Sequence, residues 1–385
     1  MEPVYLDHNA TTPLDPRVAE AMRPWLGERW GNPSSIHSFG QAAREAVEGA
    51  RAEVAELLAA RPQEIVFTSS GTEANNAVLA AVGRGCSYRG HVIVSALEHP
   101  SVARAAEALA AAGMELTRVP PAPDGVVPAG AVTAALRPET RLVCLMLANN
   151  EVGTLQPVAE VAAVCRPLAV PVLCDAVQAA GKVAVDVEAV GATYLTIGAH
   201  KFHGPLGVAA LWIGKGAPFE PHLVGGSQER RRRAGTENVP ALVGFGQACL
   251  LARRELPSRA ALLARLRDRF EAGLAALPDA VVHCRTAARL PHTSHVAFPG
   301  VEAESLLIRL DLAGFAVSTG SACASGIVEP SPTLLAMGIA PVEALSSLRI
   351  SFGLGNREEE VEALLAVLER EVAALRAAVA PVGAR

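Results

Sequence analysis

A lysine between two histidines is the first candidate for chemistry in this chain. Lys201 follows an apolar stretch that ends at Ile197, and His200 and His203 flank it. A lysine at the end of a buried strand must be paired or desolvated, and either changes its pKa. A lysine with a lowered pKa can form a Schiff base with a carbonyl cofactor. The same run, taken alone, also fits a lysine that reaches from a strand end into solvent.

Four other groups of polar residues follow predicted strands in the same way. They are residues 69–72, 98–99 and 149–151, and Asp175 with Gln178. In an open α/β sheet, ligands bind outside the carboxyl ends of the strands. We therefore expect these groups to meet Lys201 at one rim of one sheet.

The residue types at this rim suit pyridoxal phosphate. Gly71 and Thr72 precede a predicted helix, whose N-terminal N–H groups would bind a phosphate. Asp175 would pair with the pyridine nitrogen and keep it protonated. His99 is placed to stack on the ring and to carry protons near neutral pH. Each residue also has an ordinary structural interpretation, as a helix cap or a core histidine.

Two neutral amides complete this set. Gln178 and Asn150 suit the ring hydroxyl of such a cofactor, and both types are also common in turns.

Strands and helices alternate along the first part of the chain. Strands are predicted at 64–68, 91–95, 115–119, 142–148, 170–174, 193–197 and 208–213. Helices are predicted at 16–25, 39–60, 74–82, 101–112, 129–136 and 158–165. This alternation indicates βαβ units, and uninterrupted apolar strands indicate a mostly parallel sheet that is covered on both faces.

The pattern changes after about residue 225. A helical region at 239–277, interrupted by Pro257, leads to strands at 294–298, 315–318 and 348–352 and helices at 306–312 and 358–377. We expect an α/β protein with a large cofactor-binding domain at 16–250 and a smaller α+β domain at 251–385. Residues 1–15 are expected to pack with the smaller domain.

Composition excludes several classes of function. The chain has 385 residues and a formal net charge of −5, which does not favour general nucleic-acid binding. It has neither an apolar run long enough to span a membrane nor a recognisable signal peptide, so we expect no membrane association. The seven cysteines are odd in number and none has Cys-x-x-Cys spacing. This argues against a disulfide framework and a metal site, and favours a cytoplasmic location.

Motifs along nearly the whole chain carry a family resemblance. Among them are YLDHNATTP, GNPSSIH, VFTSSGTEANN, LEHPSV, NNEVG, DAVQ, GAHKFHGP, AGTENVP, STGSACASG and LRISFG. In order and spacing the set resembles cysteine desulfurases of the NifS/IscS branch, within the class-V aminotransferases of fold type I. The resemblance implies pyridoxal phosphate as cofactor, L-cysteine as substrate and a homodimer.

The resemblance also implies a role for each matching residue. Lys201 would bind the cofactor covalently, and Arg349 would hold the substrate carboxylate with Asn32 as a helper. Cys323 would take the sulfur as a persulfide and leave alanine. The cofactor-binding residues would be Lys201, His99, Asp175, Gln178, Asn150, Gly71, Thr72, His200 and, from the neighbouring subunit, Thr236.

The expected reaction uses three of these groups directly. Lys201 would abstract the α-proton, His99 would carry protons, and the thiolate of Cys323 would attack the substrate sulfur. Cys323 lies among small residues and glycines, which favour an accessible loop thiol. The sulfur would pass to an iron–sulfur scaffold, a thiolation protein or a free thiol.

Two features depart from the family, and three alternatives stay open. Gly198 stands where the family often has serine, and the pair Ser70-Gly71 replaces Gly-Ala or Gly-Gly. The alternatives are a selenocysteine lyase, another class-V aminotransferase or lyase in which Cys323 is incidental, and an inactive scaffold that keeps the fold.

Overall fold

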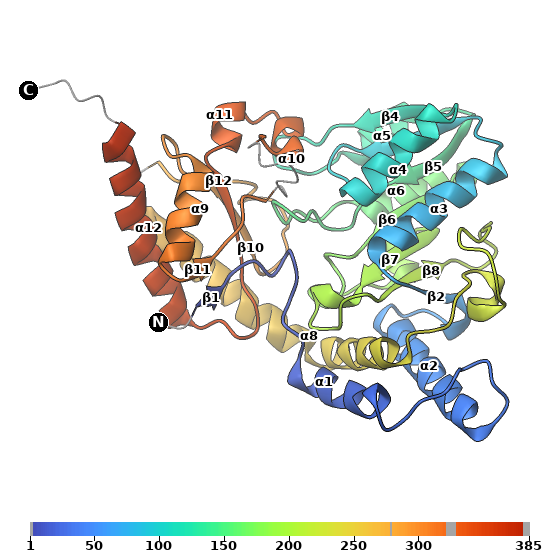
Figure 1. Ribbon diagram of the computed structural model, residues 1–385. Coiled ribbons are helices and arrows are strands. Elements are labelled where there is room, and N and C mark those ends of the chain that lie inside the picture. Colours follow the sequence, from blue (N-terminus) through green and yellow to red (C-terminus); the bar gives the residue numbers. More distant parts are fainter. Residues whose placement is uncertain (1–2, 278, 321–328, 380–385) are drawn as a thin grey trace, which may run out of the picture.

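The computed structural model describes residues 3–277, 279–320 and 329–379. Helices flank a large central sheet in one part of the molecule, and a smaller sheet with helices forms the other part (Figure 1).

The central sheet has seven strands. Their order across the sheet is β2 (Ile65–Thr68), β8 (Ala209–Ile213), β7 (Tyr194–Gly198), β6 (Val172–Asp175), β5 (Thr140–Cys144), β3 (His91–Ser95) and β4 (Glu115–Val119). β8 runs antiparallel to β2 and β7, and the strands from β7 to β4 pair in parallel. The prediction of an α/β fold with a mostly parallel sheet is therefore confirmed.

Helices cover both faces of this sheet. Successive residues of β3 bury alternate side chains, because Ile93 belongs to one hydrophobic cluster while Val92 and Val94 belong to another. The first cluster includes α2 (Ser38–Leu57), α6 (Val158–Cys165) and the start of α8 (Val239–Gly273), and the second includes α3 (Gly71–Gly85) and α4 (Pro100–Ala111). The remaining helices of this part are α1 (Pro16–Met22), α5 (Ala129–Ala135) and α7 (Val187–Val190).

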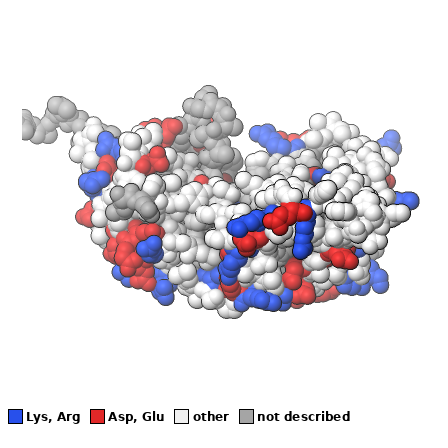
Figure 2. All heavy atoms as spheres, turned by 60° about the horizontal axis from the view of Figure 1, so that its bottom comes forward, with Lys and Arg blue, Asp and Glu red and all other residues white. Residues whose placement is uncertain are grey.

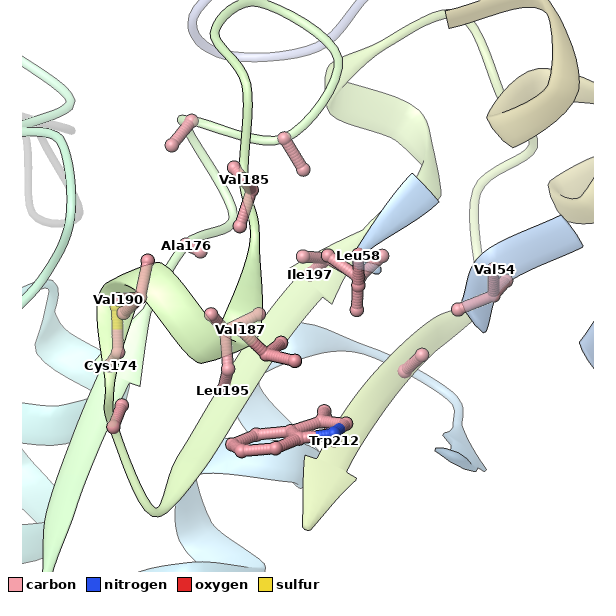
Figure 3. Close-up of a cluster of buried hydrophobic side chains, with 14 of the residues drawn as sticks. Val54, Leu58, Cys174, Ala176, Val185, Val187, Val190, Leu195, Ile197 and Trp212 are labelled. Atoms are coloured by element: carbon pink, nitrogen blue, oxygen red, sulfur yellow. The ribbon is translucent and has the colours of Figure 1, made fainter. Parts of the chain in front are cut away.

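Apolar packing fixes the strand that leads to Lys201. Leu195 and Ile197 of β7 lie in a buried cluster with Trp212 of β8 and Val187 of α7 (Figure 3). Because these side chains are buried, β7 has one register, and a 3₁₀ turn at Ala199–Lys201 follows its end directly. The cluster therefore sets where Lys201 leaves the sheet.

The C-terminal part has its own sheet and core. β12 (Ser347–Ser351), β10 (Thr293–Ala297) and β9 (Val281–Val282) pair antiparallel, and α9 (Ala303–Leu312) and α12 (Glu358–Val379) belong to the same part. Two short helices, α10 (Pro332–Ala336) and α11 (Pro341–Ala344), precede β12. The N-terminal strand β1 (Val4–Tyr5) pairs with β11 (Phe315–Ala316), and Val4 and Leu6 are buried in this core.

The long helix α8 joins the two parts and corrects one prediction. It continues through Pro257, where an interruption was expected. Pro257 lies on an exposed face, so the carbonyl that loses its helical N–H partner there can bind water. α8 also crosses the predicted boundary between 250 and 251, and the domain boundaries stay a prediction.

The predicted strand at 142–148 is also too long. β5 ends at Cys144, and the chain then turns so that Ala148 forms an isolated bridge with Leu155. The run is buried except at the half-buried Leu147, and a buried apolar run does not distinguish a strand from an irregular segment.

Figure 2 shows acidic and basic side chains side by side over the lower part of this face, while much of the rest is uncharged. None of the helices in the described part of the chain is long and apolar enough to cross a membrane.

Candidate active site

Lys201 lies where the N-terminal segment crosses the end of β7. Its Nζ donates hydrogen bonds to the main-chain carbonyls of Asn9 and Ala10, both at 2.7 Å. No carboxylate in the described ranges forms an ion pair with it. Burial, and then the nearby charge of Arg349, lower the pKa of Lys201 to about 8. Part of the Lys201 population therefore carries a neutral amine near physiological pH.

Asn9 connects this lysine with other predicted site residues. Its carbonyl also accepts a hydrogen bond from Nε2 of Gln178 at 2.8 Å, and its Nδ2 donates to the carbonyl of Asn150 at 3.1 Å. The sequence interpretation used residues 5–13 only as part of a motif and gave Asn9 no role.

Asp175 occupies the end of β6 as a buried carboxylate. Oδ2 accepts from Nδ2 of Asn75 at 2.7 Å, and Oδ1 accepts from the N–H of Val177 at 3.0 Å. Among the described residues, no lysine, arginine or histidine forms an ion pair with it. A buried carboxylate without a cation is costly, so this position favours a cationic ligand group.

His99 caps the N-terminus of α4. The N–H of Ser101 donates to Nδ1 of His99 at 3.1 Å, so a neutral His99 carries its proton on Nε2. Removal from bulk water lowers the pKa of His99, and the charge of Lys201 lowers it further, while Asp175 opposes both. The ring is consequently neutral near pH 7 and can both accept and release protons.

Asn75 couples these two residues and had no predicted role. It is fully buried, and its Nδ2 also donates to Oγ of Ser101 at 3.0 Å, beside the 2.8 Å contact between that Oγ and Nδ1 of His99. Its only sequence signal was its place in the motif VFTSSGTEANN.

The N-terminus of α3 lies beside the same strand ends. Ser70 caps the helix through the N–H of Glu73. The first N–H groups of a helix have no intrahelical acceptor, so those of Gly71 and Thr72 suit an anion. A Cβ on Gly71 would lie 2.8 Å from Cγ2 of Val177, which explains glycine here.

His200 lies next to Lys201 in the 3₁₀ turn. Its Nδ1 lies 3.1 Å from Oγ1 of Thr11. Burial and the nearby charge of Lys201 lower the pKa of His200 to about 4, so its ring is neutral near pH 7.

Arg349 comes from β12, an edge strand of the C-terminal sheet. Its Nη1 donates to the carbonyl of Asn150 at 2.8 Å, and its Nη2 pairs with Oδ1 of Asp7 at 2.6 Å. Nε is buried without an acceptor in the described part of the chain. Asp7 had no predicted role, although it lies in the motif YLDHNATTP.

Two further buried groups adjoin the site. Nζ of Lys182 donates to Oε1 of Gln178 at 2.9 Å, and burial, followed by the charge of Lys201, lowers its pKa. Burial and the charge of Asp175 raise the pKa of Glu98 to about 8. Glu98 is thus mainly protonated at pH 7.

Three predicted residues are not brought into this cluster. Asn32 and Thr236 are exposed, and no hydrogen bond in the described part of the chain joins either one to it. Cys323 lies outside the described residues.

Because the chain's lysines lie in different environments, the pH dependence of their acetylation can be compared in the cofactor-free protein. The chain's three lysines are Lys182, Lys201 and Lys215. We expect Lys201 to react with acetic anhydride with a midpoint near pH 8, because its pKa is lowered to about 8. Lys215 is exposed and serves as the control. Peptide mass spectrometry across a pH series measures both, and equal midpoints would contradict the prediction.

Comparison with known proteins identifies the family. The model of the family described as Aminotransferase class-V matches residues 4–364. The chain belongs to the class-V aminotransferase family, as the sequence motifs predicted.

Relatives of the chain within that family include cysteine desulfurases. Cysteine desulfurase IscS of Dictyoglomus turgidum is 43% identical over 376 residues, covering 97% of this chain and 95% of the relative. Cysteine desulfurase IscS 1 of Archaeoglobus fulgidus is 40% identical, covering 97% of each chain. A solved NifS-like protein has a TM-score of 0.91 and 36% identity, with coverage of 96% of this chain and 99% of that chain. The predicted resemblance to the NifS/IscS branch is therefore confirmed.

Proposed function

We propose that this protein is a pyridoxal-phosphate-dependent cysteine desulfurase. It converts L-cysteine to L-alanine and passes the sulfur to Cys323 as a persulfide. The observation that carries the proposal is the meeting of Lys201 and Arg349: Lys201 donates to the carbonyl of Asn9, and Asn9 and Arg349 both donate to the carbonyl of Asn150. The charge of Arg349 lowers the pKa of Lys201 and that of Asp175 raises it. Relatives that are 40% identical or more over nearly the whole chain support the same activity.

The rim fits pyridoxal phosphate chemically. Asp175 is a buried carboxylate without a cationic partner among the described residues, Lys201 is an amine without a carboxylate partner there, and the N-terminus of α3 suits a phosphate. Thr72 and His200 would contribute on the phosphate side, and His99, Gln178 and Asn150 would contact the ring. When bound, this cofactor supplies an electron sink for charge at the substrate α-carbon.

Arg349 and Lys201 have different roles toward the substrate: Arg349 binds it and Lys201 removes a proton from it. The guanidinium of Arg349 binds the carboxylate of L-cysteine, and Asn32 assists; Nε of Arg349 has no acceptor among the described residues. Lys201 in its neutral form removes the α-proton. His99, whose proton lies on Nε2, transfers protons to and from the reacting groups.

Cys323 makes the reaction a desulfuration. Its thiolate attacks the sulfur of the substrate, an S–S bond forms and the bond between Cβ and sulfur breaks. The electron pair of that bond stays with the substrate carbon, which is protonated on the way to alanine. The product on the protein is a persulfide, whose outer sulfur is passed to an acceptor such as an iron–sulfur scaffold or a thiolation protein.

A homodimer would complete the site. Arg44 joins the loops that carry Asn32 and Thr236, because its Nε donates to the carbonyl of Pro33 at 3.2 Å and its Nη1 lies 3.4 Å from Glu237. Large apolar side chains are exposed on these two segments, at Trp30, Ile36, Phe39, Leu223 and Val224. Such a surface is typical of a protein interface, and we propose that Thr236 reaches the phosphate of the partner subunit's cofactor from it.

The six cysteines in the described ranges are free thiols. This is compatible with a reducing compartment, and we propose a cytoplasmic location.

The test combines a product assay with mass spectrometry of the holoenzyme. L-cysteine should yield alanine and a mass increase of one sulfur on the peptide that carries Cys323. Alanine formed without this persulfide would contradict the role of Cys323 and favour another class-V lyase. Selenocysteine in place of cysteine, at equal concentration, tests the selenocysteine lyase, which would be favoured by a much higher kcat/KM for selenocysteine.

Gly198 offers a test of the phosphate side. A Cβ at residue 198 would lie 3.5 Å from Cγ1 of Val177, which is an ordinary contact. We expect Gly198→Ser to fold like the parent and to retain pyridoxal phosphate about 2- to 10-fold more tightly, because one added hydrogen bond contributes roughly 0.5–1.5 kcal/mol. Gly71→Ala is the contrasting variant, since its Cβ would collide with Val177. Fluorescence titration of the cofactor-free proteins measures both affinities, and weaker binding in Gly198→Ser would refute the expectation.

A further inference from the structure

Glu151 is a buried carboxylate whose hydrogen bonds reach across the chain to residues 331 and 333. Oγ1 of Thr333 donates to its Oε1 at 2.8 Å, and Oγ of Ser331 donates to its Oε2. Only 7% of Glu151 is exposed, and no cationic side chain in the described ranges pairs with it. Burying a carboxylate costs stability unless it is hydrogen-bonded, so these two hydroxyl groups are what keeps Glu151 in place.

The same carboxylate also lies against Gly320. A Cβ built on Gly320 would lie 3.2 Å from Oε2 of Glu151 and 3.4 Å from Nε2 of His295. Gly320 has a φ of 88°, a backbone conformation that favours glycine. Glu151 therefore lies close to Gly320 on one side of 321–328 and is hydrogen-bonded to Ser331 and Thr333 on the other; this segment contains Cys323 in the sequence.

Glu151 belongs to a turn that is itself rigidly held. Oδ1 of Asn149 accepts hydrogen bonds from the N–H groups of Glu151 at 2.8 Å and Val152 at 2.9 Å. The next residue, Asn150, accepts from Arg349 through its carbonyl. One turn thus contacts the residue proposed to bind the substrate carboxylate and the two flanks of the cysteine-bearing segment.

A second connection leads from Arg349 to the first flank. The main chain of Arg349 pairs with Ser318 in an isolated bridge, and Oγ of Ser318 accepts from the N–H of Gly320 at 3.1 Å. The first flank is therefore attached to the strand of Arg349, whereas residues 331 and 333 are attached through Glu151.

We propose that Glu151 is a positioning residue, which fixes both flanks of segment 321–328 relative to Arg349. The inference rests on the proposed desulfurase function, in which Cys323 must meet the sulfur of a substrate held by Arg349. Because the carboxylate of Glu151 is hydrogen-bonded to Ser331 and Thr333 and lies near Gly320, we expect it to contribute to sulfur transfer and not to binding of cysteine or of the cofactor.

The experiment compares Glu151→Ala, Glu151→Gln and the parent as holoenzymes. We expect Glu151→Ala to lower kcat about 10²-fold, since a misplacement of about 1 Å can have that effect, while KM for cysteine and cofactor content stay unchanged. Glu151→Gln keeps one acceptor oxygen and should recover part of the loss. Hydrogen exchange of the amides at 318–320 and 331–334 should become faster in Glu151→Ala.

Two further variants separate positioning from general destabilisation. Ser331→Ala with Thr333→Val should add no further loss of kcat to Glu151→Ala, because residues that act through one network are not additive. Ser305→Ala removes another serine–glutamate hydrogen bond, to Glu302 at 2.6 Å, and should leave kcat and exchange at 318–320 unchanged.

The outcomes are distinct. Unchanged kcat and unchanged exchange in Glu151→Ala would overturn the proposal, as would a loss that appears in KM or cofactor content instead of kcat. If the parent enzyme itself made neither alanine nor a persulfide, the proposed function would fail. The exchange at the two flanks would still decide whether Glu151 fixes them.

Discussion

Replacing Lys201 with alanine is expected to lower kcat for desulfuration by about 10⁴-fold or more. A positioned general base alone contributes about 10²–10⁴-fold, and Lys201 is also the amine proposed to hold the cofactor. Lys182 is not expected to substitute for it, because Lys182 is buried and its amine donates to Gln178. Alanine formation in single turnover and at steady state measures the loss.

A second readout does not depend on turnover. Borohydride treatment of the parent holoenzyme should leave a cofactor-sized mass increase on the peptide containing Lys201, and this increase should be absent from Lys201→Ala. Lys215→Ala is the matched control and should keep both the adduct and the parent kcat, because Lys215 is exposed. An adduct on Lys182 or Lys215 in the parent would show that the cofactor lysine has been wrongly assigned.

Replacing Cys323 with alanine should stop sulfur transfer and leave the cofactor in place. We expect kcat to fall by about 10³-fold or more, because loss of a covalent nucleophile should exceed a typical loss of general acid or base catalysis. Cofactor content should match the parent, since the groups proposed to hold the cofactor lie elsewhere, on β6, α3, α4 and the turn after β7. Sulfide release with a reductant, together with alanine formation, measures the effect.

The control for this variant is Cys86→Ala. Cys86 is a half-buried free thiol at the end of α3, at the opposite end of that helix from Gly71, and should be dispensable. If Cys323→Ala formed alanine at the parent rate, the chain would be another kind of class-V lyase. If Cys323→Ala released sulfide at the same rate as Cys86→Ala and the parent, the role proposed for Cys323 would likewise be wrong.

Local patterns identified most of the fold because the central strands are short, apolar and separated by amphipathic helices. The prediction at 91–95 coincides with β3, and the one at 158–165 coincides with α6. The same reasoning was wrong at Pro257, where tertiary packing of α8 outweighs the local tendency of proline to end a helix. It was also wrong beyond Cys144, because burial alone does not fix a strand boundary.

The sequence by itself determined which reactive side chains stand at the strand ends: Lys201 after β7, Asp175 at the end of β6 and His99 before α4. Motif order added Arg349 and Cys323, whose roles stay proposals. Only the tertiary structure decided what each group touches. The carbonyl of Asn9 meets Lys201, Asn75 joins Asp175 to Ser101 beside His99, and Glu151 reaches Ser331. These contacts join residues far apart in the chain, and local periodicity carries no information about such distant partners.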